Sequence, residues 1–382
     1  MLRAVADIAL TVTAGAAEAD RIRRLPAPVL DALHGAGLFR LLLPRPFGGM
    51  ELDPPAFARV IEALAGLDAS TAWCVCQGNG CAMTAAYLEP AVADRIWGRD
   101  PRAVLAWGPG KATARPEGDG YRVSGRWSFA SGGRHATWLG GVSTVLGSDG
   151  AVCRDATGSP IQRVMLFPAE VAPMTDVWDV IGLRGTGSDA YAVEDLPVGH
   201  AYSVSRDDPA ERRYDAPLYL FPSMVLYASG FAATALGIAR SMLDAYLGLA
   251  REKTPRLANS RLAEDSVIQS DYAQAEARHR SARAYLFGEL EDIWTAVLVS
   301  GELTIAQRMR IRLAATFAIG EAKAAAEAVY DMAGASAVFA SSPFERRYRD
   351  IRTVTQQLQG RKSHYATVGA YLFGLPPDLG AV

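Results

Sequence analysis

The chain has 382 residues, half of them hydrophobic, and its 39 lysines and arginines nearly balance its 41 aspartates and glutamates. This length is enough to bury the core of a complete enzyme, and the absence of a strong positive field disfavours nucleic acid as a partner. Only four cysteines occur, in neither a disulfide framework nor a metal-ligand spacing, which favours a reducing, cytoplasmic setting.

The first region, residues 1–99, is predicted to be a helical domain. Apolar residues recur there at three- and four-residue spacing, as in Val29, Leu30 and Leu33. That spacing places them on one face of a helix, so this face is expected to pack against the rest of the protein.

The second region, residues 100–220, changes to a period of two and is predicted to be a small β-barrel or β-sandwich domain. Tyr121, Val123, Trp127 and Phe129 alternate with polar residues, which places them together on one face of a strand. Further strands are expected at Trp138 to Val145, Val164 to Phe167 and Ala190 to Glu194.

The third region, residues 221–382, is predicted to be an antiparallel four-helix bundle. Its apolar run from Met224 to Ala239 is shorter than the roughly 20 residues that a bilayer span needs, so we interpret it as a buried helix and not as a membrane segment. A later helix carries apolar residues every fourth position from Ile305 to Phe317 and is expected to stop at Gly334. The fold class is therefore α+β, with helices, then a β domain, then a bundle.

Several common sequence motifs are absent. There is no Gly-x-Gly-x-x-Gly turn between a strand and a helix, no phosphate-binding loop and no Gly-x-Ser-x-Gly elbow. The five histidines are scattered without metal-ligand spacing. The remaining possibilities are an organic cofactor or no cofactor.

Three ordered segments resemble the acyl-CoA dehydrogenase superfamily, whose members have this same order of domains. The resemblance implies bound FAD, with FMN as the alternative, and a homotetramer built as a dimer of dimers. The first segment is 105–138, which includes the stretch from Gly125 to Trp138. The second is 178–195, which begins with the stretch from Trp178 to Ser188. The third is Phe344 to Asp350, which ends in an Arg-Asp pair.

The resemblance also implies which residues bind the flavin. The position of Phe129 stacks on the isoalloxazine ring, Ala130 follows it on the same strand, and the hydroxyl of Ser131 lies near the flavin N5, where it can donate a hydrogen bond. From the preceding strand the resemblance adds flavin contacts at Trp107 and Gly108, and it places Lys253 where relatives put an arginine that reaches a neighbouring subunit's cofactor. From the residues alone, Phe129 could equally be core, Ser131 a turn residue and Lys253 a solvated side chain.

A thioester dehydrogenase of this family needs a carboxylate to remove a carbon-bound proton. The resemblance places that base at Leu358, or at Gln359 with a one-residue shift, and neither can accept a proton. The other location used in the family falls near Tyr227, and no acidic residue occurs between Asp215 and Asp244. A desaturase would therefore lack its base.

The chain is more similar to the oxygen-activating branch, the two-component flavin monooxygenases, which receive reduced flavin from a separate reductase. Many of these relatives carry two active-site histidines, and here Asn79 and Gln357 stand near those positions. Amides can orient a substrate oxygen but cannot move a proton near neutral pH. His364, seven residues after Gln357, is a candidate replacement base if both lie on one helix face.

The leading prediction is a flavin-dependent oxygenase that uses reduced flavin and O2 on a small organic or carrier-bound substrate, with Ser131, Gln357 and Asn79 as its catalytic residues. The alternative is an acyl-CoA dehydrogenase-like enzyme without the usual glutamate. A third hypothesis is a flavin-free protein that keeps only the fold.

Overall fold

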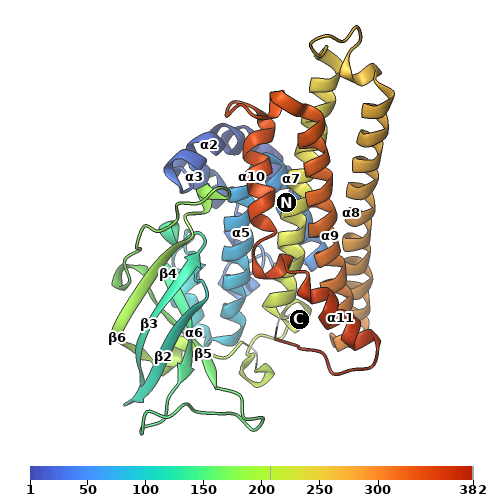
Figure 1. Cartoon of the computed structure of the whole chain (residues 1–382). Helices are drawn as coiled ribbons and strands as arrows, with labels where there is room; N and C mark the ends of the chain where they lie inside the picture. The colour runs from blue at the N-terminus through green and yellow to red at the C-terminus, as the bar shows by residue number, and fades with distance from the viewer. Residues whose placement is uncertain (207, 381–382) are drawn as a thin grey trace.

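The computed structural model describes residues 1–206 and 208–380, and its elements follow the predicted order of helices, sheet and helices. Figure 1 shows the sheet on one side of the molecule and the long helices on the other, with α5 between them. The N-terminal helices are α1 (Leu2–Asp7), α2 (Ala9–Ile22), α3 (Ala27–Gly35), α4 (Pro54–Leu67), α5 (Ala69–Ala82) and α6 (Pro90–Ala93).

The described strands form one mixed sheet of seven, in the order β6-β3-β2-β4-β5-β7, with β1 pairing beside β4. β2 and β3 are antiparallel, as are β3 with β6 and β4 with β5, whereas β2 and β1 both run parallel to β4. The strands predicted from alternation are confirmed. The bounds are β1 (Leu105–Ala106), β2 (Gly110–Glu117), β3 (Gly120–Ala130), β4 (Trp138–Val145), β5 (Gln162–Pro168), β6 (Asp189–Gly199) and β7 (Ser203–Val204).

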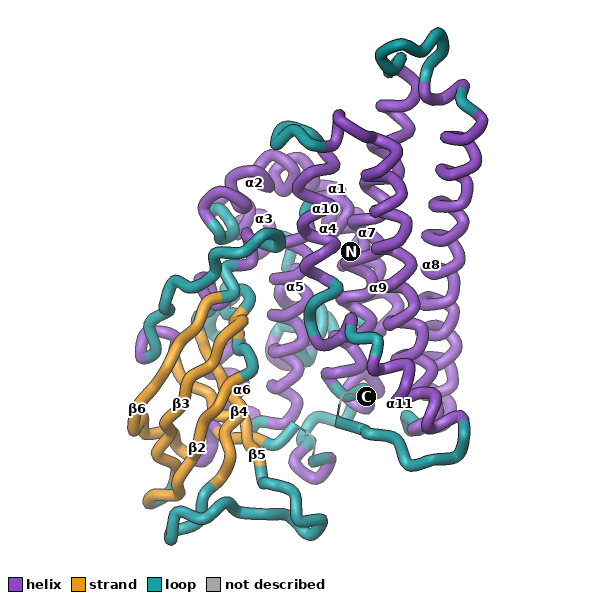
Figure 2. The backbone as a smooth tube through the Cα atoms, viewed as in Figure 1, coloured by secondary structure: helices purple, strands orange, loops and turns teal. Residues whose placement is uncertain are grey.

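The C-terminal half is helical, and Figure 2 shows its helices packed side by side along most of their length. The run from Met224 to Ala239 lies inside α7 and is almost entirely buried, as predicted for a bundle helix. The expected stop at Gly334 is also confirmed, since this residue follows the last residue of α9 with a positive φ of 55°. The helices are α7 (Ser223–Glu252), α8 (Ser266–Ser300), α9 (Ile305–Ala333), α10 (Pro343–Val354) and α11 (Ser363–Leu372).

The main hydrophobic core joins the two helical regions, and a smaller core lies beneath the sheet. The larger cluster includes Trp73 of α5, Phe231 of α7 and Ile319 of α9, so α5 is part of the helical body. The sheet cluster is built around Trp127 and Tyr191, which stack with ring centroids 5.2 Å apart. The junction between α5 and the end of β3 therefore lies where the helical core meets the core of the sheet. None of the helices in the described ranges is long and apolar enough to cross a membrane.

Candidate flavin and substrate site

The last residues of β3 break the alternation that the sequence predicts. Phe129 has a positive φ of 57°, and the pairing with β6 shifts register between Trp127 and Ala130. A bulge of this kind adds one residue to a strand and turns the following side chains to the other face. Phe129 is consequently 60% exposed while Trp127 and Ala130 are buried, so the prediction that Phe129 shares the face of Trp127 is wrong.

Phe129 presents an exposed aromatic surface at the end of this strand. Its ring meets Trp178 edge-on, with centroids 5.8 Å apart and planes at 82°. The loop that carries Trp178 also exposes the apolar side chains of Val177 and Ile181. A positive φ is costly for a bulky residue, by about 1–3 kcal/mol, and such strain is concentrated at functional sites. An exposed aromatic surface held in a strained backbone fits a flat, apolar ring such as that of a flavin.

The backbone of the preceding segment passes directly over this strand end. A Cβ at Gly108 would lie 1.8 Å from the carbonyl oxygen of Ser128, so only glycine allows this approach. Ser128 also donates its N–H to the carbonyl of Pro109 at 3.0 Å. The structure thus brings together Gly108 and Phe129, two positions at which the resemblance implies flavin contacts. The neighbouring Trp107 lies under the guanidinium of Arg206, 5.1 Å from its ring centroid.

Ser131 belongs to a chain of hydroxyl groups that sequence reasoning missed. Its Oγ accepts the indole N–H of Trp73 at 3.0 Å and lies 2.7 Å from Oγ of Ser188. Ser188 in turn lies 2.7 Å from Oγ1 of Thr186, which donates to the carbonyl of Leu183 at 2.8 Å. The segment Trp178 to Ser188 resembles a family motif, but no pattern in it indicates that its hydroxyls meet a serine 57 residues earlier in the chain.

A buried stack of three aromatic rings extends from Ser131 along α5 and α7. Trp73 stacks on Phe231 at 3.9 Å between centroids, and Phe231 stacks on Tyr227 at 5.8 Å. Tyr227 and Phe231 are four residues apart, so both project from the same face of α7. The hydroxyl of Tyr227 meets Sγ of Cys81 at 3.5 Å. Burial raises the pKa of the Tyr227 hydroxyl well above its ordinary value, so Tyr227 stays neutral.

Two carboxylates hold the loop that supplies Thr186 and Ser188. Asp189 accepts the N–H groups of Val177 and Trp178, each at 3.0 Å, and pairs with Arg134. Asp350, from the Arg-Asp pair of α10, accepts the N–H of Leu183 at 2.6 Å. Both acids serve backbone donors, and neither touches the hydroxyl of Ser131.

Asp350 is a perturbed acid within this loop support. Burial raises its pKa to about 7, with Asp68 and Asp20 acting in the same direction and the Leu183 N–H and Arg346 opposing them. Asp68 caps α5 and also has a raised pKa, chiefly because it is buried. Asp350 lies within α10 and Asp68 caps the start of α5, so both acids stabilise the frame of the site.

Asn79 and Gln357, predicted to orient substrate, lie in different settings. Asn79 is fully buried, and its amide accepts from the N–H of Leu42 at 3.0 Å while donating to the carbonyls of Leu38 and Val75. Those backbone bonds occupy the amide and favour a structural role. Gln357 accepts from the N–H of Gln359 at 2.8 Å, whereas its buried Nε2 has no hydrogen-bond partner in the part of the chain that the structure describes. Gln357 therefore keeps a donor for a ligand.

The suggestion that His364 lies on the same helix face as Gln357 is wrong. α10 ends at Val354, Gln357 precedes a short 3-10 turn, and α11 begins only at Ser363. The ring Nε2 of His364 meets the carbonyl of Leu358 at 2.8 Å, and burial lowers the pKa of the imidazole. The histidine thus bridges the turn instead of replacing a base on one continuous helix.

Lys253 lies away from this group within the chain. It follows α7 directly, and its Nζ donates to the carbonyl of Ala333 and the hydroxyl of Ser336. Along a helix, the 22 residues from Phe231 to Lys253 span about 33 Å. If the flavin ring lies against Ser131, Lys253 of the same chain therefore cannot contact that ring.

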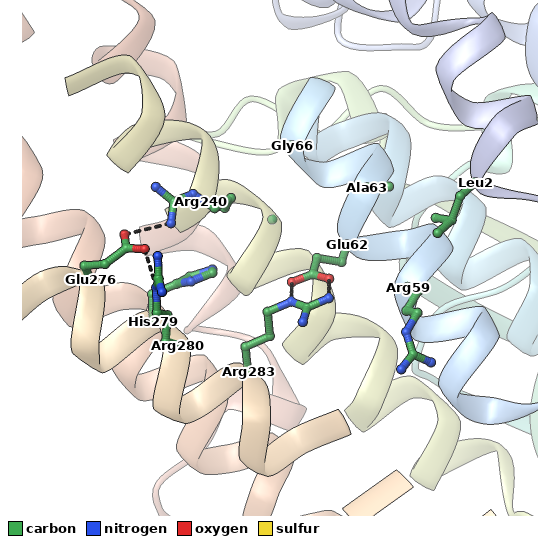
Figure 3. Close-up of a pocket in the computed structure, with 11 residues that line it drawn as sticks. Leu2, Arg59, Glu62, Ala63, Gly66, Arg240, Glu276, His279, Arg280 and Arg283 are labelled. Carbon is green, nitrogen blue, oxygen red and sulfur yellow. Dashed lines mark hydrogen bonds and ion pairs between the residues drawn. The ribbon is translucent and has the colours of Figure 1, made fainter. Parts of the chain in front are cut away.

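A groove of about 520 Å³ lies elsewhere, among α4, α7 and α8 (Figure 3). Its charged groups largely satisfy one another: Arg283 forms a bidentate pair with Glu62 at 2.7 and 2.9 Å, and Glu276 accepts from Arg240 and Arg280. Such paired charges leave little to attract a ligand, so we place the candidate site at Ser131. In residues 1–206 and 208–380, no three His, Cys, Asp or Glu side chains gather as a metal site would require.

Comparison with known families matches both helical regions. Residues 1–92 match the model "Acyl-CoA dehydrogenase, N-terminal domain", and residues 229–359 match "Acyl-CoA dehydrogenase, C-terminal domain". The sheet region between them, which carries Phe129 and Ser131, is spanned by whole-chain relatives.

About three residues in ten of those relatives are identical to this chain, over nearly their whole length. An indole-3-acetate monooxygenase of Pseudomonas putida is 31% identical, over 94% of this chain and 90% of its own. The oxygenase component of an FADH2-dependent resorcinol hydroxylase from a Rhizobium strain is 30% identical, over 98% and 94%. The crystal structure of a 3-HSA hydroxylase from Rhodococcus sp. RHA1 superposes with a TM-score of 0.90 at 26% identity, covering 100% of this chain and 98% of that one.

Proposed function

Since the chain belongs to the acyl-CoA dehydrogenase superfamily and, within it, to the oxygenase components of flavin-dependent monooxygenases, we propose that it oxygenates a small aromatic substrate with reduced FAD and O2. Relatives that act on indole-3-acetate and resorcinol support an aromatic substrate. The buried stack of Trp73, Phe231 and Tyr227 beside Ser131 also supports it, because aromatic side chains pack against flat apolar molecules and exclude water.

In this proposal the flavin ring lies against Phe129 at the end of β3, with Ala130 behind it and Ser131 at N5. Gly108 lets the backbone approach, and Trp107 closes the site from the neighbouring segment. Bound reduced flavin supplies the two electrons that split O2 between the substrate and water. The residues of the chain hold the ring, exclude water and orient the substrate, for which Gln357 offers its unpaired amide donor.

One observation carries this proposal over a dehydrogenase: the strand end offers aromatic rings and hydroxyls, while the two neighbouring acids, Asp189 and Asp350, are engaged by backbone N–H groups. The resemblance puts the base of a dehydrogenase at Leu358 or Gln359, and Gln359 is buried in contact with Arg312. A desaturase needs an acceptor for the carbon-bound proton.

Other parts of the proposal concern partners. The names of relatives as oxygenase components support a separate flavin reductase. We propose FAD over FMN because the resorcinol enzyme is FADH2-dependent. We also propose a cytoplasmic homotetramer, in which Lys253 reaches a neighbouring subunit's cofactor; four free cysteines fit the reducing compartment.

The test is to supply purified protein with FADH2 and 18O-labelled O2 in the presence of a panel of aromatic acids and phenols. We expect one labelled oxygen in a product, and a higher yield of hydrogen peroxide per oxygen consumed in Ser131→Ala. Ser143→Ala, which removes a buried hydroxyl from β4, is the matched control and should leave the yield unchanged. Bleaching of oxidised flavin by an acyl thioester without oxygen or reductase would support the dehydrogenase instead.

A further inference from the structure

The hydrogen-bonded chain that includes Ser131 has only one fully bonded arrangement of its hydrogens. Four contacts join Trp73, Ser131, Ser188, Thr186 and the carbonyl of Leu183, at 3.0, 2.7, 2.7 and 2.8 Å. One indole hydrogen and three hydroxyl hydrogens are available to fill them. Every contact holds a hydrogen bond only if all four groups donate in the same direction along the chain.

The carbonyl of Leu183 sets that direction, because it can only accept. Thr186 must therefore give its hydrogen to Leu183, which obliges Ser188 to donate to Thr186 and Ser131 to donate to Ser188. At the other end the indole of Trp73 can only donate, which agrees with the same direction. Any reversal would set two lone pairs against each other inside a buried group and lose a hydrogen bond.

Leu183 is itself held from two elements. Its N–H is bound by Asp350 of α10, and its carbonyl also accepts the indole N–H of Trp178 at 3.1 Å. The residue has a left-handed backbone with φ of 52°, so its carbonyl is fixed by the fold and does not rotate to suit a ligand.

Ser131 is left with a single free lone pair, since its hydrogen goes to Ser188 and one lone pair receives Trp73. A ligand at Ser131 must therefore be a hydrogen-bond donor. Reduced flavin carries a hydrogen on N5, whereas N5 of oxidised flavin has only a lone pair. Resting on the proposed function, we infer that Thr186 is a positioning residue that makes the site selective for reduced flavin, by orienting Ser131 as an acceptor. This inference replaces the sequence-based expectation that Ser131 donates to N5.

The test compares the dissociation constants of oxidised FAD and of reduced FAD, the latter measured anaerobically, in the wild type and in four variants. Thr186→Val removes the hydroxyl that receives the hydrogen of Ser188, so Ser188 can donate to Ser131 and free the hydrogen of Ser131 for oxidised N5. We expect the preference for reduced FAD to fall roughly three- to tenfold, the value of one hydrogen bond. For a two-electron couple, this change corresponds to a midpoint potential of the bound flavin that is lower by about 15–30 mV. Thr186→Ser keeps the donor and should retain the wild-type ratio.

Ser188→Ala provides a second route, because it removes the acceptor that holds the hydrogen of Ser131, and the same loss of preference is expected. Thr234→Val, which deletes a buried hydroxyl bonded within α7, controls for the general effect of such a deletion. If wild type prefers reduced FAD while Thr186→Val or Ser188→Ala folds and keeps the full preference, the inference is overturned and the proposed function stands. If wild type binds both forms equally, the inference is likewise overturned; if it binds neither, the proposed function fails as well.

Discussion

The indole N–H of Trp73 donates a hydrogen bond of 3.0 Å to Oγ of Ser131, and this bond joins the helical part of the protein to the sheet. Trp73 belongs to α5 and the main helical core, whereas Ser131 directly follows the last strand residue of β3. This bond fixes the end of the sheet against α5, whose Trp73 stacks on Phe231 of α7. In the proposed function, the same bond links the hydroxyl that we expect to face the flavin with the proposed substrate surface.

Trp73→Phe should remove this donor while keeping a ring on Phe231. We expect the free energy of unfolding to fall by about 0.5–1.5 kcal/mol and the preference for reduced FAD to remain, since the hydrogen of Ser131 still points to Ser188. Urea denaturation and flavin titration check both parts. Trp127→Phe removes an indole donor to Val142 within the sheet, so it is the matched control. A variant that binds oxidised FAD better than reduced FAD would contradict this account of Ser131.

Asn79→Ala should act on stability and not on turnover. The substitution removes the side-chain partner of the buried N–H of Leu42 and of the carbonyls of Leu38 and Val75, so we expect a loss of about 2–4 kcal/mol. Thermal and urea unfolding measure it, and the turnover of the folded fraction should match wild type. Asn259→Ala, at an exposed position, should change neither quantity. A large drop in turnover with unchanged stability would restore Asn79 as a substrate-orienting residue.

Gln357→Met should weaken substrate binding, because it replaces the unpaired Nε2 donor by an apolar group of similar length. We expect KM for the accepted aromatic substrate to rise roughly three- to tenfold while the affinity for reduced FAD stays the same. Steady-state kinetics with a fixed reductase supply provide the measurement. Gln356→Met, one residue earlier and exposed, serves as control. An unchanged KM would remove Gln357 from the substrate site.

Asp350→Asn should flatten the dependence of stability on pH. The unfolded Asp350 loses its proton near pH 4, whereas the folded residue holds it to about pH 7, so the unfolded state binds fewer protons in this window and wild-type stability falls as pH rises. Asn still accepts the N–H of Leu183 but cannot ionise. Between pH 5 and pH 7 we expect the wild type to lose about 1–3 kcal/mol more than the variant in urea denaturation. Parallel slopes for the two proteins would show that Asp350 does not titrate there.

The sequence by itself determined the order of helices and strands, because three- and four-residue spacing and alternation are local properties of the chain. It also pointed to Phe129 and Ser131, since both lie in one short segment that resembles a known strand. The bulge that exposes Phe129 depends on pairing with β6 and could not be read from β3 alone.

Only the tertiary structure decided what surrounds Ser131. Trp73 and Ser188 lie 58 and 57 residues away in sequence, and their hydrogen bonds with Ser131 arise from the packing of α5 and of the loop before β6. The same holds for Asn79 and His364, whose polar atoms are occupied by backbone groups that no spacing rule predicts. Periodicity reports which face of an element is buried, whereas the direction of a hydrogen bond depends on which groups the fold brings within 3 Å of one another.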